Sequence, residues 1–328
     1  MFLRTFVRLL THTQLLPILE SGEETLVGGQ AVMEGVMMRA PHSYCVAVRK
    51  PSGEIVTEQM PLPRLSEQHK IFKLPIIRGV GTLYQAMKLG FKALNFSAAA
   101  ALDNPSIPAE KRPSEKVWNG AVIANLVIGL AMFIVLYKAI PLLLVTKLEK
   151  VYPVISGRFA EATVDGLIRM AIFLMFLYGM SKMKDIFRVF QYHGAEHKVV
   201  FNYESGQAVN IENAQKFVTW HPRCGTSFLF VLLILVIPFY ALIPFQGYAA
   251  KLISRLVILP FVVGLSYELI RFAAKRRGSF LATITAPGLW LQRITTKAPD
   301  DTQAEVAIRA LEGAMELEKA QGGQLVIA

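Results

Sequence analysis

Four long apolar stretches dominate the pattern of hydrophobic and polar positions along this chain. They cover residues 118–137, 164–181, 227–245 and 252–270. Each is close to the ~20 residues that an α-helix needs to cross a bilayer core of ~30 Å. The pattern therefore predicts an α-helical integral membrane protein with about four transmembrane helices, which form a membrane domain over residues 118–270.

Basic residues predict how these helices are oriented. Lys and Arg concentrate before the first span, between the second and third, and after the fourth. Because cytosolic flanks carry the excess of basic residues, we expect both termini and the His-rich segment 182–226 to be cytosolic. The spans hold few charges at mid-depth, which argues against a transporter. Lys138 and Arg255 lie near the outer ends of their spans, where we expect them to snorkel to the interface.

The N-terminal part has a different pattern. Residues 1–24 have apolar positions at helical spacing among basic ones, which favours an interfacial helix, and residues 25–117 read as a cytosolic α+β region. Two alternating runs at 43–50 and 54–60 flank a Pro/Gly turn and predict a β-hairpin. Before it, Gly28, Gly29 and Gly35 indicate tight backbone rather than a regular strand.

Three further segments complete the predicted organisation. Residues 75–102 have the pattern of a basic amphipathic helix that lies in the interface or dips into it, and residues 103–114 form a polar, proline-rich linker. The cytosolic C-terminal tail, residues 271–328, contains a surface helix at 302–319, where charges alternate with small apolar residues.

Composition and charge fit this picture. The chain is 53% hydrophobic with a mean hydropathy of +0.41, more than a soluble domain of this length needs. The net charge of +11 is spread along the sequence, which argues against a nucleic-acid module and suits an anionic membrane surface. The two cysteines, Cys45 and Cys224, cannot build a disulfide framework and are expected to be free thiols.

One segment carries a pattern with chemical meaning. His193 and His197 are four residues apart on the same predicted helical face as neighbouring apolar residues, and Glu196 completes the order H-x-x-E-H. Two histidines at this spacing can bind one divalent metal ion such as zinc, and the glutamate would then act as catalytic general base. The alternative is a pair of core histidines, each satisfied by one hydrogen bond.

Topology predicts which residues could complete such a site. His221 and Cys224 precede the third span at its cytosolic mouth, and Glu268 lies at the cytosolic end of the fourth. We expect His221 or Glu268 as a further metal ligand, although Glu268 could instead pair with Arg271 or Arg223. Cys224 is interpreted first as a packed or neighbouring group rather than a ligand.

Two other charged residues were considered for the site. Arg223 could bind a lipid phosphate or a substrate anion, but an interfacial arginine is commonly an anchor. Glu34 stands among apolar residues with Arg39 nearby, and we expect a buried ion pair there rather than a catalytic acid.

Four motifs give the chain a family resemblance: 28–39 (GGQAVMEGVMMR), 192–198 (YHGAEHK), 221–226 (HPRCGT) and 287–292 (PGLWLQ). With these motifs the chain resembles the YqhQ-type family of bacterial membrane proteins over about residues 25–318. The resemblance implies a bacterial inner-membrane protein, in a family of unknown function that is described as predicted metal-dependent enzymes.

Two functions follow as expectations. The first is a metal-dependent hydrolase at the cytosolic interface, acting on a lipid head group or on a peptide leaving the membrane. The second is a non-enzymatic scaffold or a factor in membrane-protein biogenesis, with the large cytosolic region as its docking surface. In that case the histidines and Glu196 would form a structural hydrogen-bond network.

Overall fold

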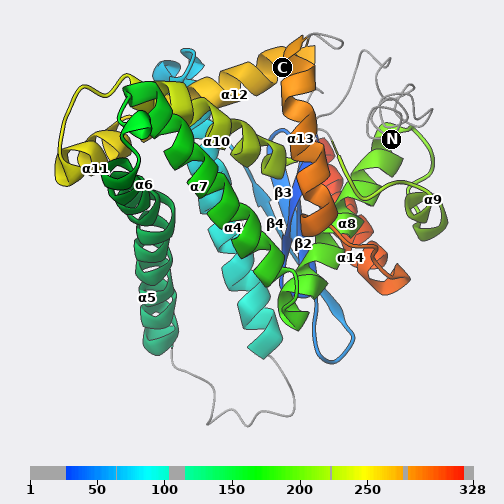
Figure 1. Cartoon of the computed structure of the whole chain (residues 1–328). Coiled ribbons are helices and arrows are strands. Elements are labelled where there is room, and N and C mark those ends of the chain that lie inside the picture. The colour runs from blue at the N-terminus through cyan, green and yellow to red at the C-terminus, as the bar shows by residue number, and fades with distance from the viewer. Residues whose placement is uncertain (1–26, 64, 103–114, 222–223, 276–279, 321–328) are drawn as a thin grey trace.

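The computed structural model describes residues 27–63, 65–102, 115–221, 224–275 and 280–320. The chain is mostly helical, with one small antiparallel sheet near its N-terminus (Figure 1). The expected interfacial helix at 1–24, the linker at 103–114 and Arg223 lie outside the described residues.

The sheet is a four-stranded meander in the order β1-β2-β3-β4. The strands are β1 (Gly28–Val32), β2 (Gly35–Arg39), β3 (Ser43–Arg49) and β4 (Ile55–Pro61). Strands β3 and β4 pair antiparallel, with Arg49 opposite Ile55, which confirms the predicted hairpin. The sequence predicts this hairpin because apolar residues alternate with polar ones on both sides of a Pro/Gly turn.

The prediction of irregular backbone around Gly28, Gly29 and Gly35 was wrong, because these residues belong to a second hairpin. Strands β1 and β2 pair across a two-residue turn in which Glu34 adopts a positive φ of 51°. The glycines serve close packing: a Cβ on Gly35 would lie 2.4 Å from the carbonyl oxygen of Ala47. Glycine here indicates close approach of neighbouring atoms rather than an irregular strand.

Helices cover both faces of this sheet (Figure 1). Side chains on one face of the sheet, including Val36, Met38 and Cys45, pack in a core with helices α8 (Lys184–Glu204) and α14 (Asp301–Ala320). Side chains on the opposite face, including Met37 and Val46, pack on helix α4 (Ile77–Leu102). The strands thus form the middle layer of an α/β/α unit that buries apolar side chains on both faces.

Helix α14 is more buried than its sequence pattern indicated. The predicted helix is present, but its small apolar residues, among them Ala304, Ala307 and Leu311, lie in the core against the sheet. Gly313 sits so close to the sheet that a Cβ there would lie 2.6 Å from Sγ of Cys45. Small residues let the helix approach the strands closely, so this is a core helix and not a surface helix.

The remaining helices form a bundle beside this unit. Its members are α5 (Glu115–Ile134), the π-helical turn η3 (Val135–Ala139), α6 (Ile140–Val151), α7 (Arg158–Met180), α10 (Gly225–Ala241), α11 (Tyr248–Val257), α12 (Leu259–Lys275) and α13 (Phe280–Thr295). Helix α10 packs against α7, α12 and α13. Short helices connect the longer ones: α3 (Leu65–Gln68), η1 (Lys70–Lys73), η4 (Pro153–Ile155) and α9 (Ile211–Gln215).

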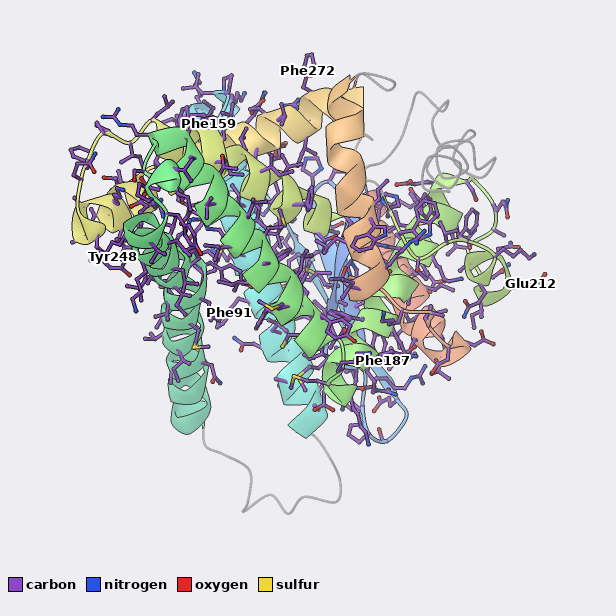
Figure 2. All side chains as sticks on the ribbon, viewed as in Figure 1. Phe91, Phe159, Phe187, Glu212, Tyr248 and Phe272 are labelled. Carbon is purple, nitrogen blue, oxygen red and sulfur yellow. The ribbon has the colours of Figure 1, made fainter. Side chains whose placement is uncertain are left out.

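Three helical segments of the described chain are long and apolar enough to cross a membrane: Val127–Val151, Arg158–Met180 and Tyr248–Phe272. The first predicted span ends too early, because helical structure continues through η3 and α6. The third corresponds to a shorter apolar helix, Phe228–Ala241. Figure 2 marks the direction of the second segment, with Phe159 near its start and Phe187 just beyond its end.

The expectation that Lys138 and Arg255 snorkel to the interface was wrong. Their side chains are buried, with 3% and 2% of the residue surface exposed, and they join an ionic cluster between the helices. Buried partners on the other segments hold these charges in place, so the side chains do not need to reach the interface.

Candidate metal site

Helix α8 carries the H-x-x-E-H segment and packs tightly on its neighbours. Its second half is buried from Tyr192 onward, with His193 only partly so. Gly194 faces the chain that leads from α13 to α14, where a Cβ would lie 2.0 Å from the carbonyl oxygen of Lys297. The backbone N–H of Lys297 donates to the carbonyl of Phe190 at 2.9 Å. These contacts fix the helix that presents the two histidines.

The two imidazole rings are oriented by backbone carbonyls. Nδ1 of His193 lies 2.8 Å from the carbonyl oxygen of Thr295, and Nδ1 of His197 lies 2.5 Å from that of Thr219. A carbonyl oxygen only accepts, so each Nδ1 carries the proton and each Nε2 keeps its lone pair. This hydrogen bond to the second ring nitrogen is the one that metal-binding histidines ordinarily make.

A cysteine joins the two histidines. Sγ of Cys224 lies 3.3 Å from Nε2 of His193, and one ligand atom from each of His193, His197 and Cys224 lies within 4.8 Å of the others. Cys224 is the N-cap residue of α10. Two imidazole nitrogens and one thiolate are ligands that suit zinc, and they leave a fourth coordination position open.

Burial also favours the neutral form of His197 that metal binding requires. The side chain is almost fully enclosed, and desolvation is the largest of the effects that lower its pKa to about 4. The hydrogen bond to Cys224 acts in the opposite direction and does not overcome the cost of burying an imidazolium. At neutral pH the ring is therefore an uncharged base.

Glu196 lies beside the three candidate ligands. It is buried, and Oε2 of its carboxylate is 3.4 Å from Nε2 of His197, on the side of the ring that faces away from the Thr219 carbonyl. Gly29 of β1 makes room for it, because a Cβ there would lie 2.6 Å from Cγ of Glu196. A carboxylate at the edge of the ligand group is where a general base for bound water would stand.

His221 is close to the site but turned toward other partners. Its ring centre lies 5.8 Å from that of His197, and its Nε2 is 3.4 Å from Oε2 of Glu204. Gln292 holds its backbone on both sides: Oε1 accepts from the His221 N–H at 2.6 Å, and Nε2 donates to its carbonyl at 2.8 Å. His221 is outside the compact ligand group, and Cys224 takes the place that was expected for it.

The structure places two other candidates away from this group. Glu268 accepts hydrogen bonds from the side chain of Arg78 and from the backbone N–H of Ile76, which tie α12 to the start of α4. Glu34 pairs with Arg188 of α8 at 2.5 Å and not with Arg39, and this ion pair is partly exposed rather than buried. Neither carboxylate belongs to the His193, His197 and Cys224 group.

Several supporting contacts had no signal in the sequence. The carbonyls of Thr219 and Thr295 belong to the backbone, so no side-chain type marks their role. Gln292 stands in the PGLWLQ motif, which contributed to the family resemblance but had no assigned role. Its two hydrogen bonds to His221 now give that motif a function in positioning the segment that leads into Cys224.

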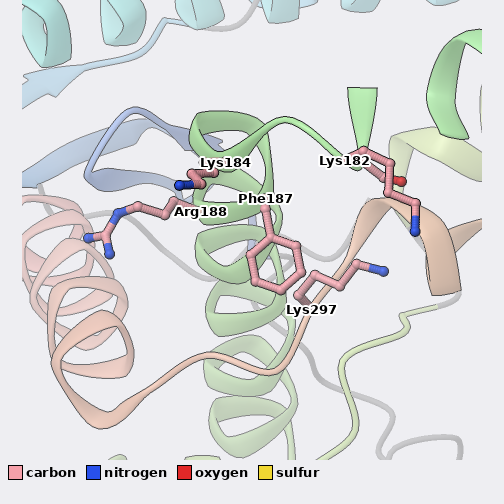
Figure 3. A pocket seen from close by; sticks show the side chains of 6 residues that line it. Lys182, Lys184, Phe187, Arg188 and Lys297 are labelled. Atoms are coloured by element: carbon pink, nitrogen blue, oxygen red, sulfur yellow. The ribbon is translucent and has the colours of Figure 1, made fainter. Parts of the chain in front are cut away.

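A basic pocket of about 480 Å³ lies at the junction of α7 and α8. It is lined by Ser181, Lys182, Lys184, Phe187, Arg188 and Lys297. Figure 3 shows the ring of Phe187 between basic side chains from both walls. Lys297, which lines this pocket, follows two residues after Thr295, whose carbonyl orients His193. Its cations attract anionic groups.

Fold and site together define a class of mostly helical protein, in which membrane-length helices stand beside a small α/β/α unit and a His-His-Cys group joins α8 to the start of α10. The chain belongs to the family described as "Protein of unknown function (DUF1385)", whose model matches residues 74–317. It is 35% identical over 294 residues to "Uncharacterized protein YqhQ" of Bacillus subtilis (strain 168), which covers 89% of this chain and 92% of that protein. No solved structure matches the chain.

Proposed function

We propose that this chain is a multi-pass protein of the bacterial inner membrane that binds a divalent metal ion, zinc in the first place, and uses it for hydrolysis at the cytosolic face. His193, His197 and Cys224 are the proposed ligands, and Glu196 is the proposed general base. The observation that carries the proposal is the pair of carbonyl hydrogen bonds at Nδ1, which leaves both Nε2 lone pairs beside the same thiol.

In the proposed hydrolysis, the metal ion and the side chains of the protein would have different roles. A bound zinc ion would supply Lewis acidity and an acidified water at the open position. Glu196 would take the proton of that water and later return it to the leaving group, which its place next to His197 allows. The carbonyls of Thr219 and Thr295 keep both rings in the required tautomer. The buried surroundings limit access of bulk water to these groups.

The packing of the α/β/α unit supports four crossings of the membrane. The sheet precedes the first candidate span, α8 lies between the second and third, and α14 follows the last. Because these three segments pack together, they lie on one side, and the chain must cross an even number of times between them. After α8, the span Tyr248–Phe272 needs a second crossing helix. Helix α10 can supply it, with 17 residues and thus a length of ~26 Å.

The distribution of Lys and Arg assigns this common side to the cytosol, with both termini there. The basic pocket beside α8 then lies at head-group depth, just past the end of the span Arg158–Met180. Its four basic side chains and one aromatic ring favour a substrate that joins an anionic group to an apolar part, such as a phospholipid. A lipid head group is therefore preferred over a peptide.

Metal content tests the proposed site. Wild-type chain purified in detergent without chelator should carry about one equivalent of zinc by elemental analysis. The double variant His193→Ala/His197→Ala should lose it almost completely, and Cys224→Ser should bind at least about tenfold more weakly. His69→Ala, an exposed histidine outside the site, is the matched control and should retain the metal. Equal metal content in all four proteins would rule the site out.

A second variant separates the enzyme from the non-enzymatic scaffold or biogenesis factor. Glu196→Gln removes the general base but no proposed ligand, so it should keep its zinc while the cellular function is lost. Complementation of a deletion strain reads out that function without knowledge of the substrate. Full complementation by a metal-loaded Glu196→Gln protein would favour the scaffold, whose function depends on docking surfaces instead.

A further inference from the structure

A second polar cluster lies inside the helical bundle and plays no part in the metal site. Its buried members are Lys138 of η3, Asp165 and Arg169 of α7, Tyr240 of α10 and Arg255 of α11, each with at most 5% of its surface exposed. All three membrane-length segments and the shorter apolar helix contribute to it. Charged side chains at such positions are costly and commonly mark a binding site or pathway.

Asp165 is the carboxylate that hydrogen-bonds directly to the guanidinium groups of this cluster, and Glu161 lies further from Arg255, at 3.7 Å. The Asp165 carboxylate pairs with Arg169 on its own helix and accepts a hydrogen bond from Nη1 of Arg255 at 2.7 Å. Arg169 also donates from Nε to the carbonyl oxygen of Tyr137 at 3.0 Å. Asp165 is therefore shared by two guanidinium groups, and Arg255 has a second, longer contact with Glu161.

The third cation, Lys138, stands on the far side of Tyr240. Its Nζ donates to the Tyr240 hydroxyl at 2.8 Å. The tyrosine ring centre is 5.4 Å from Lys138 Nζ, 4.9 Å from Cζ of Arg169 and 4.7 Å from Cζ of Arg255. Cation–π contact offsets part of the repulsion between three buried positive charges, but a tyrosine ring supplies no counter-charge.

Several hydrogen-bond donors of this cluster have no acceptor among the described residues. Nη1 of Arg169 and Nε of Arg255 are buried and have no partner within the described part of the chain. Lys138 has one hydrogen bond for its three N–H groups, and the Tyr240 hydroxyl accepts from Lys138, so its own proton is available to donate. The cluster thus offers several donors and net positive charge, and its buried atoms without a partner in the described chain are donors.

We infer that this cluster is an anion-binding site that takes an oxyanion, a phosphate group in the first place. A phosphate has only acceptors when ionised, and its oxygens match the fork of donors on arginine. Its negative charge would compensate Lys138 and the unpaired parts of Arg169 and Arg255. The phosphate could come from solution or from a lipid head group, because the recognising chemistry is the same.

The carboxylates around the cluster do not neutralise its excess of positive charge. Toward the end of the bundle, Glu161 pairs with Lys251 at 2.6 Å and lies 3.7 Å from Arg255. Glu149 is also close enough to act on Lys251 and Arg255 electrostatically. Counting both, four basic side chains face three carboxylates, and the two outer carboxylates lie on the side of Lys251. The inner group around Tyr240 keeps the excess of positive charge.

The anion site and the metal site occupy the two ends of α10. Cys224 caps the first end, and Tyr240 lies 16 residues further, or ~24 Å along the helix axis. Lys138 also lies in the π-helical turn η3, and π-turns within α-helices are frequent at functional sites. A ligand at this end therefore does not compete with the metal.

Binding of phosphate by the full-length protein tests the inference. Detergent-purified chain is titrated with inorganic phosphate and followed by thermal stability, and native mass spectrometry records retained phosphatidylglycerol. Lys138→Met removes a donor and a charge but leaves both Asp165 pairs, so folding should survive. We expect affinity to fall roughly tenfold or more. Tyr240→Phe keeps the ring and removes only the hydroxyl, and should weaken binding by a few fold.

Lys147→Met is the matched control, because Lys147 is an exposed lysine of α6 outside the cluster. It should bind like the wild type. Phosphate binding that depends on Lys138 supports a free oxyanion, whereas retention of phosphatidylglycerol alone, with the same dependence, supports a lipid head group. Absence of both ligands from the wild type, or equal binding by wild type, Lys138→Met and Tyr240→Phe, would overturn the inference. Zinc content should be unchanged throughout.

Discussion

The two ends of helix α10 solve opposite electrostatic problems. At the first end, His193 and His197 present Nε2 lone pairs beside the Cys224 thiol, because the Nδ1–H of each ring donates to a backbone carbonyl. At the second end, Lys138, Arg169 and Arg255 present protons around Tyr240, and Asp165 compensates only part of their charge. The first end therefore suits a cation and the second suits an anion. The comparison shows that burial alone does not define a site; the balance of donors and acceptors indicates what is missing.

The largest expected difference is in the rate at which the two cysteines are alkylated, because only Cys224 belongs to the proposed metal site. Burial raises the pKa of Cys45 to about 12, which leaves about a thousandfold less thiolate than its ordinary pKa of 9.0 would give. N-ethylmaleimide at pH 7.5 should therefore label one thiol per folded chain, identified as Cys224 by peptide mass. Zinc should protect it. Rapid labelling of Cys45 in the folded protein would contradict the packing described for α14.

The next largest effect should come from Asp165→Ala at the cationic end. Removing this carboxylate leaves Arg169 and Arg255 buried without their shared partner, which we expect to lower the free energy of unfolding by about 3–5 kcal/mol. Denaturation in mixed micelles measures this. Thr163→Ala, at a partly exposed position on the same helix whose hydroxyl donates to the carbonyl of Phe159, should have little effect. Zinc binding by the folded fraction should stay normal, and a loss of zinc there would show that the two ends are coupled.

A smaller effect is expected at Gly194, which positions the metal end. Gly194→Ala would place a Cβ 2.0 Å from the carbonyl oxygen of Lys297, so the segment that joins α13 to α14 must shift. We expect a loss of about 1–3 kcal/mol in stability and weaker zinc binding, since Thr295 lies on the segment that moves. Gly179→Ala, with open space around it in α7, should be neutral or slightly stabilising. Equal behaviour of the two variants would contradict the described contact.

The smallest effect should follow from breaking the Glu34–Arg188 ion pair. Both side chains are partly exposed, so Glu34→Gln should change stability by about 1 kcal/mol or less. Thermal melts at low and high salt should show that this small difference disappears as salt rises. A large loss of stability would mean that the pair is more enclosed than these exposures indicate.

The sequence predicted the elements whose signal lies in side-chain periodicity. The spacing of His193 and His197 placed both on one helical face, and the position of Cys224 before an apolar helix brought it to the same depth. The hairpin of β3 and β4 followed from alternation around a turn. In each case the relevant information is local, because side-chain direction follows directly from the helical or extended backbone.

The parts that sequence could not predict depend on tertiary partners. Nothing in the pattern around Lys138 or Arg255 distinguishes a snorkelling side chain from one that meets Asp165 or Tyr240 on another helix. Glu268 likewise gained its partner, Arg78, from a helix 190 residues away in sequence. The alanine-rich face of α14 resembled a solvated helix until the sheet supplied a surface to cover. The sequence favoured a packed or neighbouring role for Cys224 over that of a ligand, and it is the 3.3 Å approach of its Sγ to Nε2 of His193 that makes it a candidate ligand.

The assembly of the α/β/α unit from distant segments has a consequence for synthesis of the protein. About 240 residues separate the end of β4 from the start of α14, which covers one face of the sheet. Helix α8 is made earlier and covers part of this face, but at ~5–20 residues per second the part under α14 has no permanent cover for roughly 10–50 s while the membrane helices are made. An apolar sheet exposed for this long is prone to aggregate. Early inserted chains are therefore expected to need a holding factor, and ribosome-bound chains that stop before α14 should be the ones it retains.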